Sequence, residues 1–264
     1  MKTSTGVYGG EAIAAGRRVS YELETPFDEH CNIPVVLVPG FLESGWGLRD
    51  ARHEIVTELK RPAVTVNFGS PGIKRGQALG AIMDELGYPG YALMLHSRGG
   101  TSLPELSDAN LKRIQAVALM ASSGLIEGDT AIAVSGRIVA SATEEYLLTS
   151  AHNPIKAAQL GWRALLYMAQ NPLTTFIEGC DTACADIKPQ IGRLQKFGVT
   201  TTATVFSRDS VYPPDLVADS SEHLFGTGMF TEHPDPTLRH LAPEYNPSSV
   251  IDIINHLHQK TQAS

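Results

Sequence analysis

One serine of this chain stands among residues that would suit a nucleophile. Residues 95–100 read Leu-His-Ser-Arg-Gly-Gly, and they follow an apolar segment, residues 91–95, that predicts a buried strand. A serine at a tight strand-to-helix turn has its hydroxyl forced out above the sheet, and it faces the positive end of the following helix. Such a turn is cramped, and Gly99 provides the small residue that it requires. The sequence therefore predicts that Ser97 is a nucleophile.

A serine nucleophile needs a general base, and the base needs a carboxylate that orients it. Candidates for both lie on the C-terminal side of Ser97. Asp209 closely follows the expected strand at 201–206, whereas Asp215 and Asp219 lie farther from the end of that strand. The histidines beyond Asp209 are His223, His233, His240, His256 and His258. These residue types are those of a Ser-His-Asp triad, which performs acyl transfer.

These features resemble the α/β-hydrolase family. In that family the turn reads Gly-x-Ser-x-Gly, and the triad occurs in the chain order serine, acid, histidine. The resemblance covers essentially the whole core, because the order of strands and helices also fits. One residue departs from the pattern, since Leu95 stands where the family normally has glycine or another small residue. This leucine must find space against the packed helix, so an altered turn or a low activity stays an open alternative.

The resemblance implies a role for each remaining member of the triad. Residues 204–213 are similar to the family's strand that ends in an acid, which makes Asp209 the acid. In the family the histidine lies about seven residues before a proline that opens the final helix. His240 has that spacing to Pro247, and His233 is the second choice. His256 and His258 fall inside the final helix.

The resemblance also implies an oxyanion hole. Residues 38–42, Val-Pro-Gly-Phe-Leu, are similar to the family's His-Gly-x loop, with Pro39 in place of the usual histidine. Carried over by position, the donors are the backbone amides of Phe41 and Arg98. Such donors are often the largest catalytic contribution, because they are in place before charge develops. For the side chain of Arg98 we expect a structural ion pair rather than a contact with an anionic substrate.

The elements that must position these residues alternate along the chain. Strand and helix patterns follow one another through residue 120, which predicts an α/β fold with a mostly parallel central sheet flanked by helices. The expected strands are 34–38, 63–68, 91–95, 115–120 and 201–206, after an edge hairpin at 7–23. The expected helices are 50–60, 77–86, 103–113, 155–168, 187–197 and 248–258. Residues 237–239 make only a poor last strand.

The alternation breaks after residue 125. From there to about residue 175 the patterns are helical, which predicts an inserted helical cap at 126–179. Residues 1–125 and 180–264 would then form the α/β-hydrolase core domain. We expect Trp46 and Trp162 to be packing residues.

Composition narrows the classes of function. The net charge of −7 disfavours a nucleic-acid partner, because no basic patch stands out to neutralise phosphates. No signal peptide and no membrane span are recognisable, so we expect a cytoplasmic protein. The cysteines Cys31, Cys180 and Cys184 do not make a zinc site, and phosphate-loop and dinucleotide-binding patterns are missing. We therefore expect no metal and no cofactor, and a homodimer is compatible with the sequence.

The leading hypothesis is a serine hydrolase of the carboxylesterase type that acts on a small, largely apolar substrate. Ser97 would attack the acyl carbonyl, His240 would transfer the proton, and Asp209 would hold the imidazole. Hydrolysis of a lactone or of a carbon–carbon bond on the same triad is an alternative, since this scaffold supports many reactions. A catalytically weak ligand-binding protein with the same fold is the rival class, and Leu95 motivates it.

Overall fold

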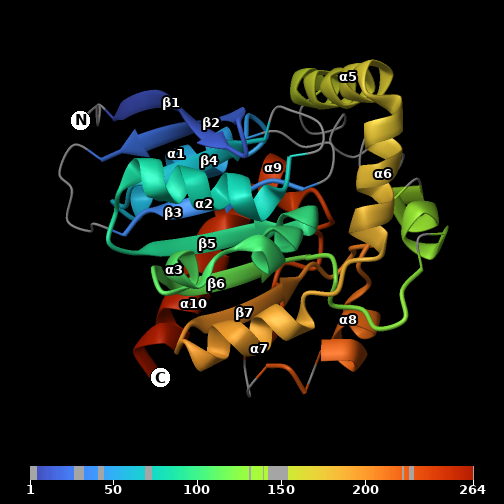
Figure 1. The fold of residues 1–264 in the computed structure, drawn as a ribbon. Helices are drawn as coiled ribbons and strands as arrows, with labels where there is room; N and C mark the ends of the chain where they lie inside the picture. The colour runs from blue at the N-terminus through green and yellow to red at the C-terminus, as the bar shows by residue number, and fades with distance from the viewer. Residues whose placement is uncertain are drawn as a thin grey trace.

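Eight strands form the sheet of this protein, in the order β1-β2-β4-β3-β5-β6-β7-β8 within the residues that the structure describes (Figure 1). The structure is a computed structural model, and it describes residues 5–26, 33–40, 45–68, 73–130, 132–138, 140–141, 154–221, 223–225 and 229–263. The strands are β1 (Gly6–Ala14), β2 (Arg17–Thr25), β3 (Val35–Val38), β4 (Ala63–Asn67), β5 (Tyr91–His96), β6 (Ile114–Met120), β7 (Thr200–Val205) and β8 (Phe230–Glu232).

The sheet is mostly parallel, as the sequence predicts. β2 pairs antiparallel with both β1 and β4, and every other neighbouring pair is parallel. The β1–β2 hairpin closes through Ala15 and Gly16, whose φ angles of 48° and 77° are both in the left-handed region. Two such residues make the tight turn whose twist matches that of the flanking strands. The predicted edge hairpin is confirmed.

Helices cover both faces of the sheet (Figure 1). α2 (Arg75–Leu86) and α7 (Lys188–Lys196) lie in front of it in this view, and α1 (Arg49–Glu58) and α10 (Ser248–Ala263) lie behind it. β3 and β5 are buried along their full length. Strands covered on both faces are apolar without alternation, which is why their sequences predicted a parallel sheet. The carboxyl ends of the parallel strands meet at one edge, where the serine turn lies.

The helix after the serine differs from the prediction of a single helix at 103–113. A 3₁₀ helix, η1 (Ser97–Glu105), begins at the serine itself, and a short α-helix, α3 (Asp108–Leu111), follows. Pro104 lies inside η1, and a proline prevents a continuous α-helix because it lacks the N–H donor. Ser107 starts α3 anew, since its side chain accepts a hydrogen bond from the amide of Asn110 at 3.1 Å.

Several helices lie in the described part of the chain between β6 and β7. Residues 132–138 are helical, and α5 (Pro154–Gln170) and α6 (Pro172–Ala183) follow. Pro172 opens α6 directly after α5 ends, so the two helices run in different directions (Figure 1). α6 continues through residue 180, where the sequence placed the return to the core.

The last strand lies earlier than the sequence suggested. It is β8 at Phe230–Glu232, whereas residues 237–239 belong to the loop that follows it. β8 is a three-residue strand at the sheet edge and is not fully buried, so it carries no strong apolar pattern. The loop after β8 leads to α9 (Ala242–Tyr245), and α8 (Pro214–Ser221) lies between β7 and β8.

Candidate active site

Ser97 occupies a sharp turn at the end of β5. Its φ angle is 49°, a left-handed conformation that costs a non-glycine residue about 1–3 kcal/mol and is typical of functional sites. The glycines that follow allow the turn to pack closely. A Cβ on Gly99 would lie 2.7 Å from the backbone oxygen of Val38, and a Cβ on Gly100 would overlap the hydroxyl of Ser122. Neither position has room for a side chain.

Leu95 does not prevent this turn. Its side chain is fully buried in the core, and within the sheet it pairs with Val38 of β3 and Leu119 of β6. The turn is further held by the backbone oxygen of Ser97, which accepts a hydrogen bond from the amide of Ser123 at 3.1 Å. Of the two alternatives that Leu95 left open, the altered turn is not found at Ser97, whose left-handed conformation forms with a leucine two positions before it.

Three side chains from distant parts of the chain meet at this turn. His240 Nε2 lies 2.9 Å from Ser97 Oγ, and His240 Nδ1 lies 2.9 Å from Asp209 Oδ2. All three residues are buried, with 3%, 8% and 3% of the surface of Ser97, His240 and Asp209 exposed. Because a carboxylate only accepts hydrogen bonds, Nδ1 carries a proton and Nε2 is left to accept the hydroxyl proton.

The carboxylate of Asp209 is fixed independently of His240. Its Oδ1 accepts hydrogen bonds from the backbone amides of Val211 and Tyr212, both at 2.8 Å. The loop that carries Asp209 is joined to the loop of His240 by a bond from the amide of Arg208 to the oxygen of Leu238, at 3.1 Å. One carboxylate oxygen thus holds its own loop while the other orients the imidazole.

The imidazole of His240 lies beside two other rings. The His96 ring centre is 5.1 Å from that of His240, and the Tyr212 ring centre is 5.4 Å away. His96 Nε2 also donates a hydrogen bond to the backbone oxygen of His240 at 2.8 Å. Burial, and then the charge of Asp209, raise the pKa of Tyr212, so this residue stays a neutral phenol. His96 and Tyr212 were not among the residues singled out from the sequence, although His96 directly precedes the serine.

The competing candidates lie elsewhere. His233 directly follows β8 and faces α10, with its Nε2 3.6 Å from the carboxylate of Asp252. Burial lowers the pKa of His233 below its ordinary value, and its Nδ1 accepts the amide hydrogen of Asp235 at 3.2 Å. The competing acids Asp215 and Asp219 are exposed on α8. The triad geometry is therefore made by His240 and Asp209.

Arg98, the residue after the serine, contacts the helices between β6 and β7. Its guanidinium lies 2.9 Å from the carboxylate of Glu178 on α6, and both side chains are largely buried. Tyr167 of α5 donates its hydroxyl to the same carboxylate at 3.0 Å. Burial, and then the charge of Glu178, raise the pKa of Tyr167 to about 12. The structural ion pair expected for Arg98 is confirmed.

The segment Pro39–Gly40 is held by a residue that the sequence did not single out. Arg75, at the start of α2, donates hydrogen bonds to the backbone oxygens of Pro39 and Gly40, at 2.8 and 3.0 Å. Its guanidinium lies 4.6 Å from the centre of the Phe68 ring. Phe41, the first oxyanion donor expected from the sequence, lies outside the described residues. No sequence signal marks Arg75, because an arginine at a helix start is ordinarily a surface residue.

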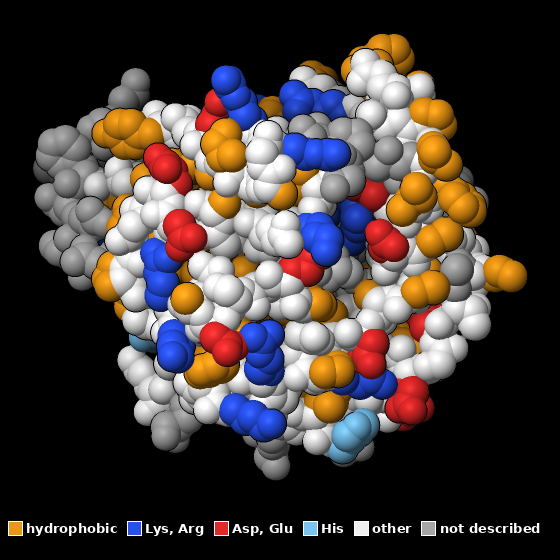
Figure 2. Space-filling model, viewed as in Figure 1, with side chains coloured by type: hydrophobic (Ala, Val, Ile, Leu, Met, Phe, Trp, Pro, Cys, Tyr) orange, Lys and Arg blue, Asp and Glu red, His pale blue; other side chains and the backbone are white. Residues whose placement is uncertain are grey.

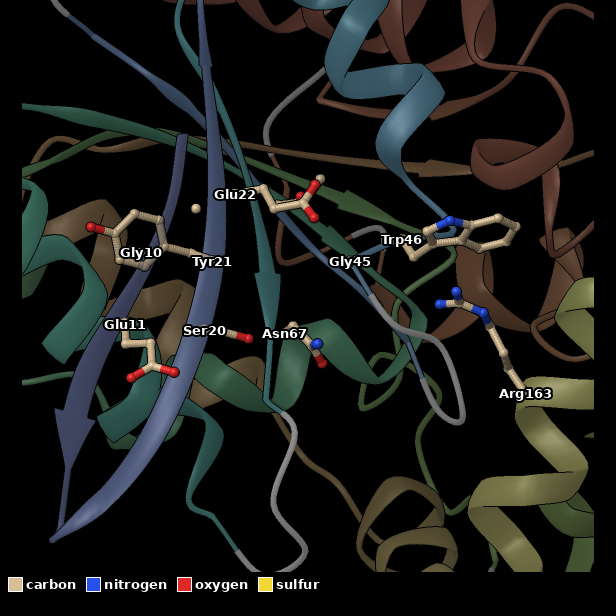
Figure 3. A pocket seen from close by; sticks show the side chains of 11 residues that line it. Gly10, Glu11, Ser20, Tyr21, Glu22, Gly45, Trp46, Asn67 and Arg163 are labelled. Carbon is tan, nitrogen blue, oxygen red and sulfur yellow. The ribbon is translucent and has the colours of Figure 1, made fainter. Parts of the chain in front are cut away.

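A cavity of about 560 Å³ lies on the sheet face formed by β1, β2 and β4 (Figure 3). Polar side chains from these strands line it, among them Glu11, Ser20 and Asn67. Trp46 and Arg163 of α5 close its other side, with the guanidinium 4.2 Å from the indole ring centre. Ser97, His240 and Asp209 do not line this cavity, so it is separate from the candidate reaction centre.

Two further searches cover only the described part of the chain. There, no group of three or more histidine, cysteine or acidic side chains is arranged to hold a metal ion. None of the helices described is long and apolar enough to cross a membrane. Cys180 and Cys184 are free thiols, and Cys31 lies outside the described residues.

Comparison with known proteins finds similarity in structure alone. No family model matches the chain, and no curated protein matches it. Among solved structures, it is similar to a thermophilic esterase from Thermogutta terrifontis, with 17% identity, a TM-score of 0.69, and 96% of this chain and 99% of that chain covered. It is also similar to an enol-lactonase from Burkholderia xenovorans, with 15% identity, a TM-score of 0.63, and 93% and 100% coverage.

A third similar structure is a membrane phospholipase A, with 13% identity and a TM-score of 0.70. The match covers 98% of this chain and 88% of that chain. Near-complete coverage together with the strand order shows that this chain has the α/β-hydrolase fold. Sequence identities this low show a shared fold and do not show a shared function.

Proposed function

We propose that this protein is a serine hydrolase that cleaves a carboxylic-ester-type bond of a small, largely apolar substrate. The observation that carries the proposal is the continuous hydrogen-bonded chain from Ser97 through His240 to Asp209, with both links at 2.9 Å. A serine in a left-handed turn, a histidine and a buried carboxylate supply the nucleophile, the base and the orienting group of acyl transfer. The α/β-hydrolase fold raises the expectation by analogy only.

In the proposed reaction, Ser97 Oγ attacks the acyl carbonyl while its proton passes to His240 Nε2. The imidazolium that forms is stabilised by the Asp209 carboxylate, which accepts from Nδ1. The same proton then goes to the departing alkoxide, and an acyl-enzyme remains. Water, deprotonated by His240, attacks the acyl carbon, and the acid leaves when Ser97 recovers its proton.

The negative charge on the carbonyl oxygen needs donors that are in place beforehand. We assign this role to the backbone amides of Phe41 and Arg98. Arg75 supports the assignment, because it holds the two carbonyl groups directly before Phe41. In this scheme Arg75 is a positioning residue, and it does not touch the substrate.

The helices of residues 126–179 act as a cap over Ser97 in this proposal. The ion pair between Arg98 and Glu178 supports it, since one partner directly follows the nucleophile and the other lies on α6. Removing water from the site would strengthen the electrostatic stabilisation of the oxyanion. The cap would also define which substrates fit, and the rest of the triad chemistry would be the same for each.

A lactone or a carbon–carbon bond hydrolase uses the same triad, and the similar structures include an enol-lactonase. A catalytically weak binding protein is the rival from another class. Its motivation, Leu95, is weakened by the normal left-handed turn at Ser97. Comparing the rates of hydrolysis of a lactone and of an open-chain ester would distinguish a lactonase from an esterase.

The direct test compares Ser97→Ala with the wild-type protein on a short-chain chromogenic ester. We expect hydrolysis to fall to the uncatalysed rate in the variant, and a fluorophosphonate to label Ser97 in the wild type only. Ser248→Ala, an exposed serine at the start of α10, is the matched control and should keep full activity. Equal rates for wild type and Ser97→Ala, with no adduct on Ser97, would establish the binding-protein alternative.

A further inference from the structure

The exposed apolar side chains of this protein are concentrated on α5 and α6. Thirteen large hydrophobic residues are exposed in the described part of the chain, and seven of them lie on these two helices. We call these seven the α5–α6 apolar surface: Ile155, Trp162, Leu165, Leu166, Leu173, Phe176 and Ile177. Trp162 is 66% exposed and Phe176 is 69% exposed, so the expectation that Trp162 is a packing residue is wrong. Figure 2 shows apolar side chains gathered along the side of the molecule where α6 lies.

The two helices present this surface because their apolar residues recur at helical spacing. On α5, Ile155, Trp162 and Leu166 are separated by seven and four residues, so they share one side of the helix. Tyr167 is half-buried and donates its hydroxyl to Glu178 on α6, so it lies on a different side. An ordinary surface helix turns polar residues to water and apolar residues to the core. α5 turns a tryptophan and three large aliphatic side chains to water instead.

α6 continues the pattern. Phe176 and Ile177 lie three and four residues after Leu173, and all three are exposed. Its Glu178 is directed away from them, since its carboxylate meets Arg98 and Tyr167. Monomeric soluble proteins rarely expose contiguous apolar patches above a few hundred Å², and larger ones mark interaction sites. The concentration on two successive helices indicates a partner for this surface.

The charges on α5 and α6 distinguish between two possible partners for this surface, a second copy of the chain and a negatively charged apolar partner. The whole chain carries a net charge of −7, yet the sequence of α5 contains Lys156 and Arg163 and no acidic residue. A second copy of this chain would bring the same surface with the same cations, because a two-fold interface joins identical patches. Asp181 is the one exposed acid on α6, so self-pairing would leave the cations of α5 poorly matched. A negatively charged apolar partner fits better.

We propose that the α5–α6 apolar surface docks on an anionic lipid surface. A helix with tryptophan, phenylalanine and leucine on one side and cations beside them lies in the plane of a membrane interface, with its apolar side in the boundary between headgroups and acyl chains. Trp162 and Phe176 supply the aromatic rings, and Arg163, which is exposed although its guanidinium lies over the Trp46 ring, supplies positive charge beside them. The docking needs neither Ser97 nor any step of hydrolysis, so it stands apart from the proposed function.

The test is co-sedimentation of the full chain with vesicles of phosphatidylcholine, with and without phosphatidylglycerol. We expect binding to the anionic vesicles, weaker binding to the neutral ones, and weakening by salt. The double variant Trp162→Gln/Phe176→Gln should bind about tenfold less tightly or worse, because two inserted side chains are lost. Its matched control, Val7→Gln/Ile13→Gln on β1, removes two residues of similar exposure and should bind like the wild type.

Fluorescence gives a second, local readout. The chain has two tryptophans, so Trp46→Phe leaves Trp162 as the single reporter. Its emission should shift to the blue on anionic vesicles as the ring leaves water. Failure of the wild type to bind either vesicle, or equal losses in the double variant and its control, would overturn the proposal. So would a lipid-free dimer in sedimentation velocity that the double variant dissociates, because a second copy would then cover this surface.

Discussion

His96 donates the hydrogen on Nε2 to the backbone oxygen of His240 at 2.8 Å, and this bond joins the strand before Ser97 to the loop that carries His240. A carbonyl oxygen only accepts, so the tautomer of His96 is fixed with its proton on Nε2. The two residues are separated by 144 positions in the chain, and both are buried. Within the proposed mechanism, His96 is a positioning residue for His240.

His96→Leu should therefore lower kcat about 10- to 100-fold and change KM little, since a shift of the base by about 1 Å has effects of that size. His96→Gln retains an N–H donor and should recover much of the loss. The measurement is steady-state ester hydrolysis by both variants, with thermal unfolding as a check on folding. If His96→Leu and His96→Gln have the same kcat, the hydrogen bond to His240 does not position the base.

Asp209→Asn should leave the fold nearly intact and lower kcat by about 10⁴-fold. The amide can still accept the backbone hydrogens of Val211 and Tyr212, but it no longer selects the tautomer of His240 with its proton on Nδ1. Activity and melting temperature should be measured on one preparation. Asp215→Asn, on the exposed side of α8, is the matched control and should keep full activity. A comparable loss of kcat in Asp215→Asn would show that the effect is not specific to Asp209.

Gly100→Ala should destabilise the protein by about 1–3 kcal/mol, because the new methyl group would overlap the hydroxyl of Ser122. Combining it with Ser122→Ala removes that hydroxyl, and the next neighbours would lie at 3.3 to 3.4 Å. Denaturant unfolding of the two single variants and the double variant gives the coupling energy, which should be favourable. Gly192→Ala, on α7 with nothing within 4 Å of the added Cβ, should be neutral or stabilising. Additive effects of the first two changes would contradict the predicted overlap.

His233 should make stability depend on pH. Burial lowers its pKa below the ordinary value of 6.5, although the carboxylates of Asp252 and Asp235 raise it in part. The folded state therefore binds fewer protons than the unfolded state as the pH falls through 6.5, and stability is lost on the acid side. Above that pH both states are neutral at this position and the contribution is constant.

His233→Asn keeps an acceptor for the amide of Asp235 and cannot titrate. Its free energy of unfolding should fall less than that of the wild type between about pH 7 and pH 5. The check is a series of urea unfolding curves across this range for both proteins. Parallel pH profiles would show that His233 does not contribute to acid sensitivity.

The sequence by itself determined the class of fold and the parts of the proposed triad. β3 and β5 are apolar without alternation because both of their faces are buried, so their sequences alone predicted a parallel sheet. Ser97 was singled out by its place directly after a buried strand, and Asp209 and His240 by the resemblance of their order and spacing to the α/β-hydrolase pattern. The helix at 103–113 and the last strand were misjudged, since Pro104 and the short edge strand β8 leave weak local patterns.

The spacing to Pro247 put His240 before His233, but only the tertiary structure shows which side chain reaches the serine, because that depends on where each loop directs its imidazole. It also brought in His96, Tyr212 and Arg75, whose contacts join segments far apart in the chain. The helical spacing of apolar residues on α5 predicts a helix, but it does not say which side meets the core. Only packing decides that, and here it leaves the tryptophan of α5 facing water.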